Sequence, residues 1–143
     1  MKNLLKLGTV AGLLLLWGGP AVHGQQADRV VKFSAPFAFQ VENDRLPAGE
    51  YTVLVHGGWI QIQGKKVDVN VLTMPVSQKN SQEVETASVV FHQYKGHFFL
   101  AQIWAPGQSA GREVLTSPEE KQLAKQVEMA AVKLPLNTGG RGQ

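Results

Sequence analysis

The glycine pair Gly57-Gly58, flanked by two hydrophobic segments, constrains the fold of this chain more than any other stretch of its sequence. Glycine accepts positive φ angles, so such a pair between alternating segments predicts a β-hairpin with a two-residue turn. Pairing across the turn sets Val55 opposite Ile60 and Val53 opposite Ile62. Because side chains alternate along a strand, these four residues share one face, which we expect to be the core face.

A second hairpin is predicted where Lys95-Gly96 separates two aromatic-rich segments. A two-residue loop pairs Tyr94 with His97 and His92 with Phe99. Both faces carry large apolar groups, so we expect both to be covered. One face is predicted to hold Val90, His92, Tyr94, His97, Phe99 and Ile103, and the other Val89, Phe91, Phe98, Leu100 and Trp104.

The C-terminal segment predicts an amphipathic helix that covers this hairpin. Ser117 as N-cap and Glu120 three residues later form a capping box, with proline at the first helical position. One apolar stripe follows at helical spacing. Its members are Leu123, Val127, Ala130, Ala131 and Leu134. Pro135 is expected to end the helix, which gives a helix over residues 118–134 and a flexible tail over 135–143.

Further strands are predicted at "VVKF", "FAFQV", "VDVNVLTM" and "REVL", with Pro75 closing the third of these. The polar residues 77–86 are expected to form an exposed connection. The predicted fold class is therefore mainly β. We expect six to eight short antiparallel strands forming an open or closed barrel, with the one C-terminal amphipathic helix.

The first 24 residues have the layout of a cleaved secretory signal peptide. Lys2 and Lys6 precede a short apolar run, and small residues lead to Gly24. The run is shorter than the roughly 20 residues that a membrane-spanning helix needs, so a retained anchor is only the alternative. We expect cleavage after Gly24 or two or three residues away, and export to the periplasm or the extracellular space. The mature chain is predicted to hold one domain, residues 25–134, without stable membrane insertion.

Composition excludes several kinds of chemistry. The chain has no cysteine, so disulfides, thiolate chemistry and cysteine-based zinc sites are absent. The net charge of +3 includes Lys2 and Lys6, and Lys65-Lys66 is the one basic cluster left without them. We therefore expect no nucleic-acid partner. Neither a phosphate-binding glycine loop nor a calcium-loop motif occurs, so no cofactor is expected.

Two stretches carry a longer pattern: "FAFQVENDRLPAGEYTV" and "VVFHQYKGHFFLAQIWAPGQSAGREV", followed by a helix that opens with "SPEE". In this order of F-x-V, L-P-A-G-x-Y-x-V and an aromatic hairpin ending in I-W, the chain resembles a group of small exported bacterial proteins. The match spans about Phe37 to Lys125. It implies export and a β-rich fold, and it carries over no functional residues. The L-P-A-G segment itself is typical of a turn, with Leu46 tucked under the sheet.

The segment "GQSAG", residues 107–111, matches the G-x-S-x-G pattern around the nucleophile of many esterases. That mechanism needs a helix directly after the serine and a histidine farther along the chain. A strand is predicted to follow instead, and no histidine lies C-terminal to Ser109. We therefore interpret Ser109 as a loop residue, and no catalytic residue is assigned.

The histidines supply the remaining candidates. His92 and His97 are diagonal neighbours on one predicted face, which makes them weak metal-ligand candidates, but a third ligand is missing. His56 and Trp59 flank the first turn and could form a recognition patch. The candidate ligand or partner surface is therefore His56, Trp59, His92, Tyr94 and His97.

The leading hypothesis is a non-catalytic binding or structural module of the cell envelope or extracellular space. Its partner could be a protein, an envelope component or a small ligand. One alternative is a hydrolase or metal-dependent enzyme that uses His92 and His97. The other is a barrel-type carrier of a small apolar ligand, which requires a cavity because small barrels are otherwise filled by side chains.

Overall fold

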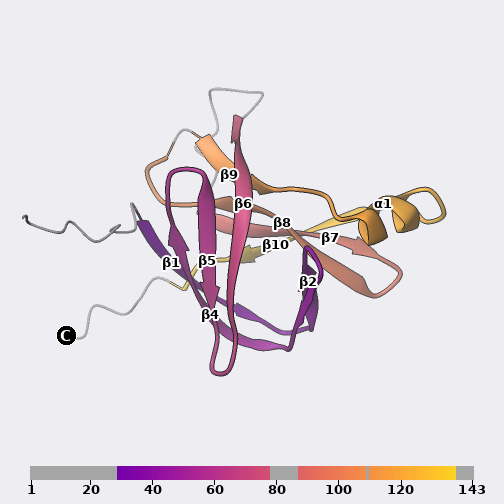
Figure 1. Cartoon of the computed structure of the whole chain (residues 1–143), viewed down its shortest axis with the longest axis horizontal. Coiled ribbons are helices and arrows are strands. Elements are labelled where there is room, and N and C mark those ends of the chain that lie inside the picture. Colours follow the sequence, from indigo (N-terminus) through magenta and orange to yellow (C-terminus); the bar gives the residue numbers. More distant parts are fainter. Residues whose placement is uncertain (1–28, 78–86, 109, 138–143) are drawn as a thin grey trace, which may run out of the picture.

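The computed structural model describes residues 29–77, 87–108 and 110–137, and these form a mainly β structure (Figure 1). The predicted signal peptide, Ser109 and most of the predicted polar connection lie outside the described residues. The described part contains ten strands and one short helix. In chain order they are β1 (Arg29–Ala35), β2 (Phe39–Val41), β3 (Asp44–Leu46), β4 (Gly49–Val55), β5 (Trp59–Gln63), β6 (Asp68–Ser77), β7 (Ser88–Tyr94), β8 (His97–Trp104), β9 (Ala110–Val114), α1 (Pro118–Ala124) and β10 (Ala130–Pro135).

The strands pair in the order β1-β4-β5-β6-β9-β8-β2-β3, and β7 joins by pairing with β8 and β10. Every described pair is antiparallel except β2 with β8. The predicted fold class, mainly β with a helix near the C-terminus, is confirmed. The strand number exceeds the six to eight expected, because three-residue strands such as β3 carry too little periodicity to be recognised.

Closure into a barrel is not confirmed, because the sheet is open and β1 and β10 form no ladder. The two strands nevertheless lie close together, and a residue just beyond β10 bonds to β1. Asn137 donates from its backbone N–H to Lys32 O at 2.7 Å and from its side-chain amide to Ser34 Oγ at 3.0 Å. The sheet is therefore curved enough to bring β10 beside β1.

The hairpin around Gly57-Gly58 forms in the predicted register, with Val55 opposite Ile60. The four side chains predicted for its core face are all buried. Neither glycine has a positive φ, so the turn differs in type from the one expected. The turn is bonded to the next strand, since the C=O of Gly58 accepts from the N–H of Thr73 in β6 at 3.0 Å.

The β7–β8 hairpin also forms around the predicted turn. Lys95 and Gly96 have φ of 46° and 81°, and two positive angles are what a type I′ turn requires. Tyr94 lies opposite His97, as predicted. This end of the hairpin was predictable because a short turn fixes the register of the strands beside it.

A β-bulge between Val90 and Phe91 corrects the predicted faces farther along this hairpin. Val89 lies opposite Ile103, and Phe91 lies opposite Leu100, so Ile103 belongs to the core face. The predicted unbroken alternation was wrong here, because a bulge inserts one residue and reverses the facing of those beyond it. The core covers one face, and on the other face Glu120 of α1 bonds to His92 and Tyr94, whereas His97 is exposed.

Aromatic side chains from four strands fill the core. The ring of Phe33 in β1 lies 6.1 Å from Phe39 in β2, 5.6 Å from Tyr51 in β4 and 6.0 Å from Phe91 in β7, measured between centroids. Leu46, ahead of the proline turn, is fully buried beneath them, as predicted. The interior is thus occupied by packed rings.

Strand β6 corrects one predicted boundary. Pro75 was expected to end this strand, but β6 continues to Ser77 and Pro75 lies opposite Arg112 of β9. Proline removes one N–H donor but keeps its carbonyl, so a flanking strand can still hold the segment in a ladder.

The predicted helix over residues 118–134 is wrong in extent, because α1 ends at Ala124 and β10 follows. Ser117 is the N-cap as predicted, and its hydroxyl accepts from the N–H of Glu120 at 3.2 Å. Beyond the helix, the chain pairs with the free edge of β7 from Ala130 to Pro135. An unpaired buried edge outweighs a weak helical stripe, since it offers a whole ladder of hydrogen bonds. The flexible tail predicted over 135–143 is wrong at its start, because Pro135 ends β10 and Asn137 is bonded to β1; residues 138–143 lie outside the described residues.

The contact of Gly111 with Trp104 gives a test of the β8–β9 packing. A Cβ on Gly111 would come within 2.7–2.9 Å of three ring carbons of Trp104, whose ring is 6% exposed. We expect Gly111→Ala to lower the free energy of unfolding by about 1–3 kcal/mol, because the buried ring has little room to move. The control is Gly57→Ala, since nothing lies within 4 Å of that position. Equal urea midpoints for both variants would show that the ring is free to shift.

Candidate functional site

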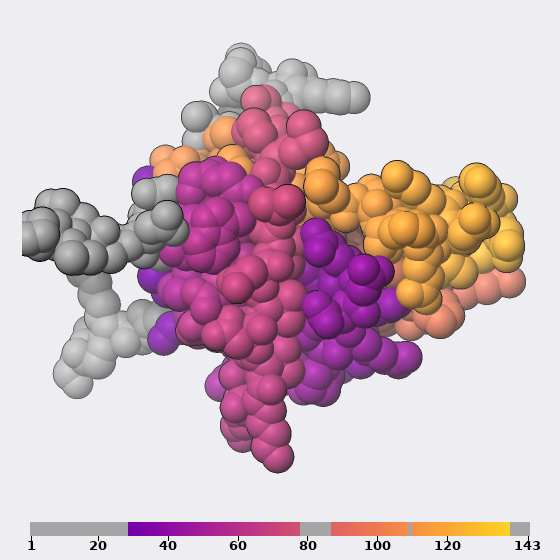
Figure 2. Space-filling view, in the orientation of Figure 1, coloured from indigo at the N-terminus to yellow at the C-terminus, as the bar shows by residue number. Residues whose placement is uncertain are grey.

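The face of the β7–β8 hairpin opposite the core carries a buried polar cluster. Glu120 of α1 is 5% exposed, and its Oε1 lies 2.7 Å from Nδ1 of His92. The hydroxyl of Tyr94, a residue 4% exposed, donates to the same oxygen at 3.1 Å. Figure 2 shows α1 and the turn after it standing beside the tip of this hairpin. One carboxylate therefore binds two of the predicted site residues.

Burial and the neighbouring carboxylate set the titration of Tyr94. Removal from water raises the pKa of the Tyr94 phenol to about 12, and the charge and hydrogen bond of Glu120 act in the same direction. Each effect disfavours the phenolate, because it would be poorly solvated and would face a like charge. Tyr94 is thus held as a neutral hydrogen-bond donor.

This geometry describes a clamp between α1 and β7 rather than a reactive centre. Glu119, the neighbouring residue, accepts from Nε2 of Gln40 in β2 at 2.8 Å, so the helix is bonded to two strands. His92 has a quarter of its side chain exposed, whereas His97 is exposed opposite Tyr94. Within the described ranges, no group of three or more His, Cys, Asp or Glu side chains could hold a metal ion.

The other predicted pair, His56 and Trp59, is brought together at the first turn. Their rings stack at 3.7 Å with an interplanar angle of 12°. His56 is buried, and its Nε2 has no hydrogen-bond partner in the described part of the chain. Trp59 is half-buried and lies opposite Leu72, which is 64% exposed. The exposed surface at this turn is therefore the apolar face around Trp59, and His56 lies under it.

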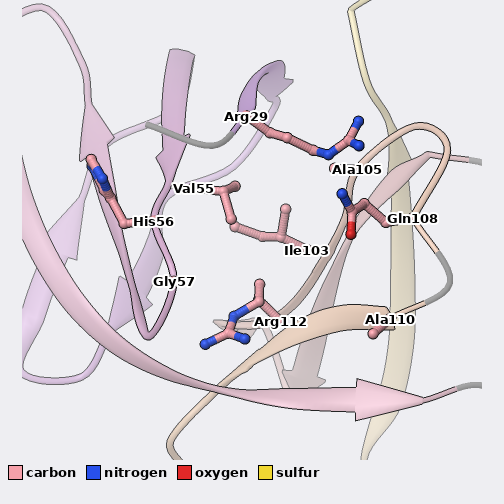
Figure 3. A pocket seen from close by; sticks show the side chains of 9 residues that line it. All are labelled: Arg29, Val55, His56, Gly57, Ile103, Ala105, Gln108, Ala110 and Arg112. Atoms are coloured by element: carbon pink, nitrogen blue, oxygen red, sulfur yellow. The ribbon is translucent and has the colours of Figure 1, made fainter. Parts of the chain in front are cut away.

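A pocket of about 270 Å³ opens beside His56, at the end of the sheet where β1 begins (Figure 3). Its nine lining residues come from β1, β4, β8, β9 and the adjoining turns. They are Arg29, Val55, His56, Gly57, Ile103, Ala105, Gln108, Ala110 and Arg112. Val55 and Ile103 are buried core residues, so the floor of the pocket is the end of the hydrophobic core.

Two arginines give the pocket its charge. Nη1 of Arg29 donates to Pro106 O at 2.8 Å, and the Gln108 carboxamide oxygen, once it faces this guanidinium, accepts from Nη2 at 2.7 Å. Arg112 donates from Nε to Thr73 Oγ1 at 2.9 Å and from Nη2 to Thr73 O at 3.1 Å. All of these acceptors are neutral, and neither arginine forms a salt bridge within the described residues. Both side chains are partly exposed to solvent.

A larger hollow of about 870 Å³ lies on another part of the surface. The proline turn that begins at Pro47, the β5–β6 turn and Asn137 border it. Its lining includes Glu50 and the lysines Lys65 and Lys66 of the β5–β6 turn, all three exposed to solvent. Charged side chains that stay exposed on surface turns are common in folded proteins and do not by themselves indicate a ligand site.

The sequence did not reveal the residues that complete either site. Glu120 was recognised as a helix cap, and nothing local shows that its carboxylate reaches β7. Arg29 and Arg112 lie far apart in the sequence, and a single arginine in a polar context is usually interpreted as a surface charge. Both arginines could have been recognised as pocket residues only if the order of the strands were known, because that order decides which side chains meet at the end of the core.

Comparisons with family models, with curated proteins and with solved structures find no match to this chain.

The titration of Tyr94 is directly measurable, because the chain has two tyrosines. In Tyr51→Phe we expect the phenolate absorbance to report Tyr94 alone, with a pKa of about 12. Adding Glu120→Gln should lower that pKa, but not to its ordinary value of about 10, because burial persists. Adding Glu119→Gln instead should leave it unchanged. A titration near the ordinary value in Tyr51→Phe would contradict the buried geometry.

The same shift predicts how stability depends on alkaline pH. The folded-state pKa of Tyr94 is raised, so the neutral phenol contributes to the free energy of unfolding. This contribution is fully present below the unfolded-state pKa of about 10 and is lost as pH rises through about 12.

Removing the carboxylate should release α1 from the sheet. We expect Glu120→Ala to reduce the free energy of unfolding by about 1–3 kcal/mol, because it leaves the buried Tyr94 hydroxyl without its acceptor. Hydrogen exchange should show lost protection in α1 and unchanged protection in the β4–β5 hairpin. Glu128→Ala, a substitution of an exposed residue, is the control. Unaltered protection of α1 in Glu120→Ala would rule out the clamp.

Proposed function

We propose that this protein is an exported, non-catalytic binding module that holds a small ligand in the arginine pocket. The observation that carries the proposal is the pocket itself, in which a few polar groups stand over an apolar floor. Ligand sites in proteins commonly combine an apolar lining with a small number of placed polar groups. A volume of about 270 Å³ suits a small molecule rather than a segment of a partner protein.

Export is supported by the sequence of the first 24 residues and by the resemblance to small exported bacterial proteins. No helix of the described residues is long and apolar enough to cross a membrane. On this proposal the module acts in the cell envelope or outside the cell. We further propose that its curved sheet works as an open barrel, with the seam between β1 and β10 and the pocket at one mouth.

The two alternative functions have less support. A hydrolase or metal-dependent enzyme needs His92 and His97 to converge with a third group, but His92 is bonded to Glu120 in the clamp and His97 is exposed. A carrier of an apolar ligand needs space inside the sheet, and the Phe33, Phe39 and Phe91 rings occupy the interior. Binding at the mouth avoids both difficulties.

Filling the pocket tests the proposal. Ala110 is half-buried in the pocket lining, so Ala110→Phe should place a ring in the ligand's space. We expect a thermal-shift screen of small acidic, neutral and basic compounds to give ligands for the purified protein. Ala110→Phe should weaken their binding about tenfold or more, equivalent to about 1.4 kcal/mol.

The matched control is Ala130→Phe, because Ala130 is exposed on β10 and does not line the pocket. It should bind every ligand as the original chain does. The proposal fails if no compound binds, or if Ala110→Phe binds as well as Ala130→Phe.

A further inference from the structure

We propose that the outer face of strands β1, β4, β5 and β6 is an interface through which two copies of this chain pair about a two-fold axis. The proposal goes beyond the proposed function and does not depend on it, because this face lies on the other side of the sheet from the core. Two observations carry it: an uncovered apolar stripe on this face, and opposite charges at the two ends of one row of residues across the strands.

The stripe consists of apolar side chains that point away from the core. Side chains alternate along a strand, so the neighbours of the buried residues in β1, β4, β5 and β6 point outward. The large apolar members of this outward set, which we call the outer stripe, are Val30, Leu54, Trp59, Leu72 and Met74. Val30, Leu72 and Met74 are each more than half exposed, and no other large hydrophobic side chain of the described residues is.

The ladder pairs place the members of the outer stripe next to one another. Val30 lies opposite Leu54, and Trp59 lies opposite Leu72. Leu54 pairs with the residue two beyond Trp59 in β5, which makes Leu54 and Trp59 diagonal neighbours. Met74 is the next outward residue after Leu72 in β6. The outer stripe is therefore continuous from β1 to β6.

No helix or strand of the described residues packs over the outer stripe. The packing contacts between described elements run between paired strands and between β1 and β10. Figure 2 views this side of the sheet, with β5 and β6 in front of the other coloured segments. Single exposed apolar residues are common, whereas contiguous ones mark interaction surfaces. The outer stripe therefore has the character of an interface.

Trp59 is held in place at the middle of the outer stripe. Its ring stacks on the buried ring of His56 at 3.7 Å, and its C=O accepts from the N–H of His56 at 2.9 Å. A side chain that is already ordered loses little conformational entropy when it binds. Tryptophan is also enriched among the few residues that dominate the energetics of protein interfaces. Trp59 is therefore suited to be the central contact with another protein surface.

Charges on the same face indicate that this surface is a second copy of the chain. One row of ladder partners crosses the four strands, and its members are Lys32, Thr52, Gln63 and Asp68. Its two ends, Lys32 and Asp68, are exposed and opposite in charge. A two-fold axis that runs along the strands between β4 and β5 places β1 of one copy over β6 of the other. Lys32 of each copy then faces Asp68 of the other copy, which gives two opposite-charge pairs.

An anionic membrane surface fits the outer face less well. Faces that bind such membranes combine apolar groups with many Lys and Arg residues. Here Glu113 lies opposite Met74, and Asp68 is on the same face, so carboxylates border the outer stripe. Paired copies related by a two-fold axis are also the commonest soluble oligomers.

The test measures self-association by sedimentation equilibrium, on protein purified after expression of the full chain. We expect a monomer–dimer equilibrium with a Kd between about 10 µM and about 1 mM, since the outer stripe forms only the centre of an interface of ordinary size. Met74→Glu places a charge in the outer stripe and should weaken the dimer at least about tenfold. The matched control is Met129→Glu, because Met129 is an exposed methionine beyond α1, outside the outer stripe. It should leave the Kd unchanged.

Two charge variants test the two-fold arrangement. Lys32→Glu and Asp68→Lys each place like charges across the interface, and each should weaken the dimer about threefold or more. An equal mixture of the two variants should restore dimerisation, because each pair in the mixed dimer again joins a cation and a carboxylate. Lys121→Glu, which changes an exposed residue of α1, is the control. Circular dichroism confirms that each variant is folded.

Each outcome supports or overturns the proposal. A protein that stays monomeric up to about 1 mM overturns it, and so does a dimer that Met74→Glu weakens no more than Met129→Glu. A dimer that neither charge variant weakens, or that the mixture does not restore, overturns the two-fold arrangement and the proposal with it. A monomer that binds phosphatidylcholine vesicles through Met74 would assign the face to a membrane instead. Ligand binding in the arginine pocket is tested separately by Ala110→Phe, so the proposed function stands or fails independently.

Discussion

The packing of aromatic rings from β1, β2, β4 and β7 is the constraint on which the rest of this structure depends. Phe33 contacts the rings of Phe39, Tyr51 and Phe91, so strands far apart in the chain share one core. A flat sheet could not bring these strands together, and the curvature they impose also brings Asn137 to β1. The arginine pocket lies at the end of this core, where the core residues Val55 and Ile103 line it.

The parts of this fold that the sequence predicts are those set by short-range geometry. The partners of Val55 and Tyr94 follow from the turns beside them, and both registers are confirmed. The last segment shows the opposite case, because Ala130 to Pro135 carries both a helical stripe and a strand alternation. Its choice of β10 depends on the free edge of β7, which the local sequence does not reveal. The bulge at Val90 is missed for a related reason, since an inserted residue leaves no periodic signal.

The candidate sites divide in the same way. His92 and Tyr94 were predicted to share a face because one hairpin determines it, but their partner Glu120 comes from a separate element. Arg29 and Arg112 belong to strands that are separated in the sheet by β4, β5 and β6. They face one pocket because the curved sheet brings its strands around a common core. A site formed by curvature cannot be recognised from the spacing of its residues.

The two clusters also differ in how completely the protein satisfies its own charges, and this difference separates a structural role from a binding role. In the clamp, the Glu120 carboxylate is bonded to both His92 and Tyr94, so its hydrogen-bonding partners come from within the fold. In the pocket, Arg29 and Arg112 have neutral acceptors, and no described carboxylate pairs with them. Both arginine side chains are partly exposed, so water shares in solvating their charges. The clamp is thus satisfied within the fold, whereas three N–H groups of Arg112 have no acceptor in the described part of the chain, which supports the proposed binding role of the pocket.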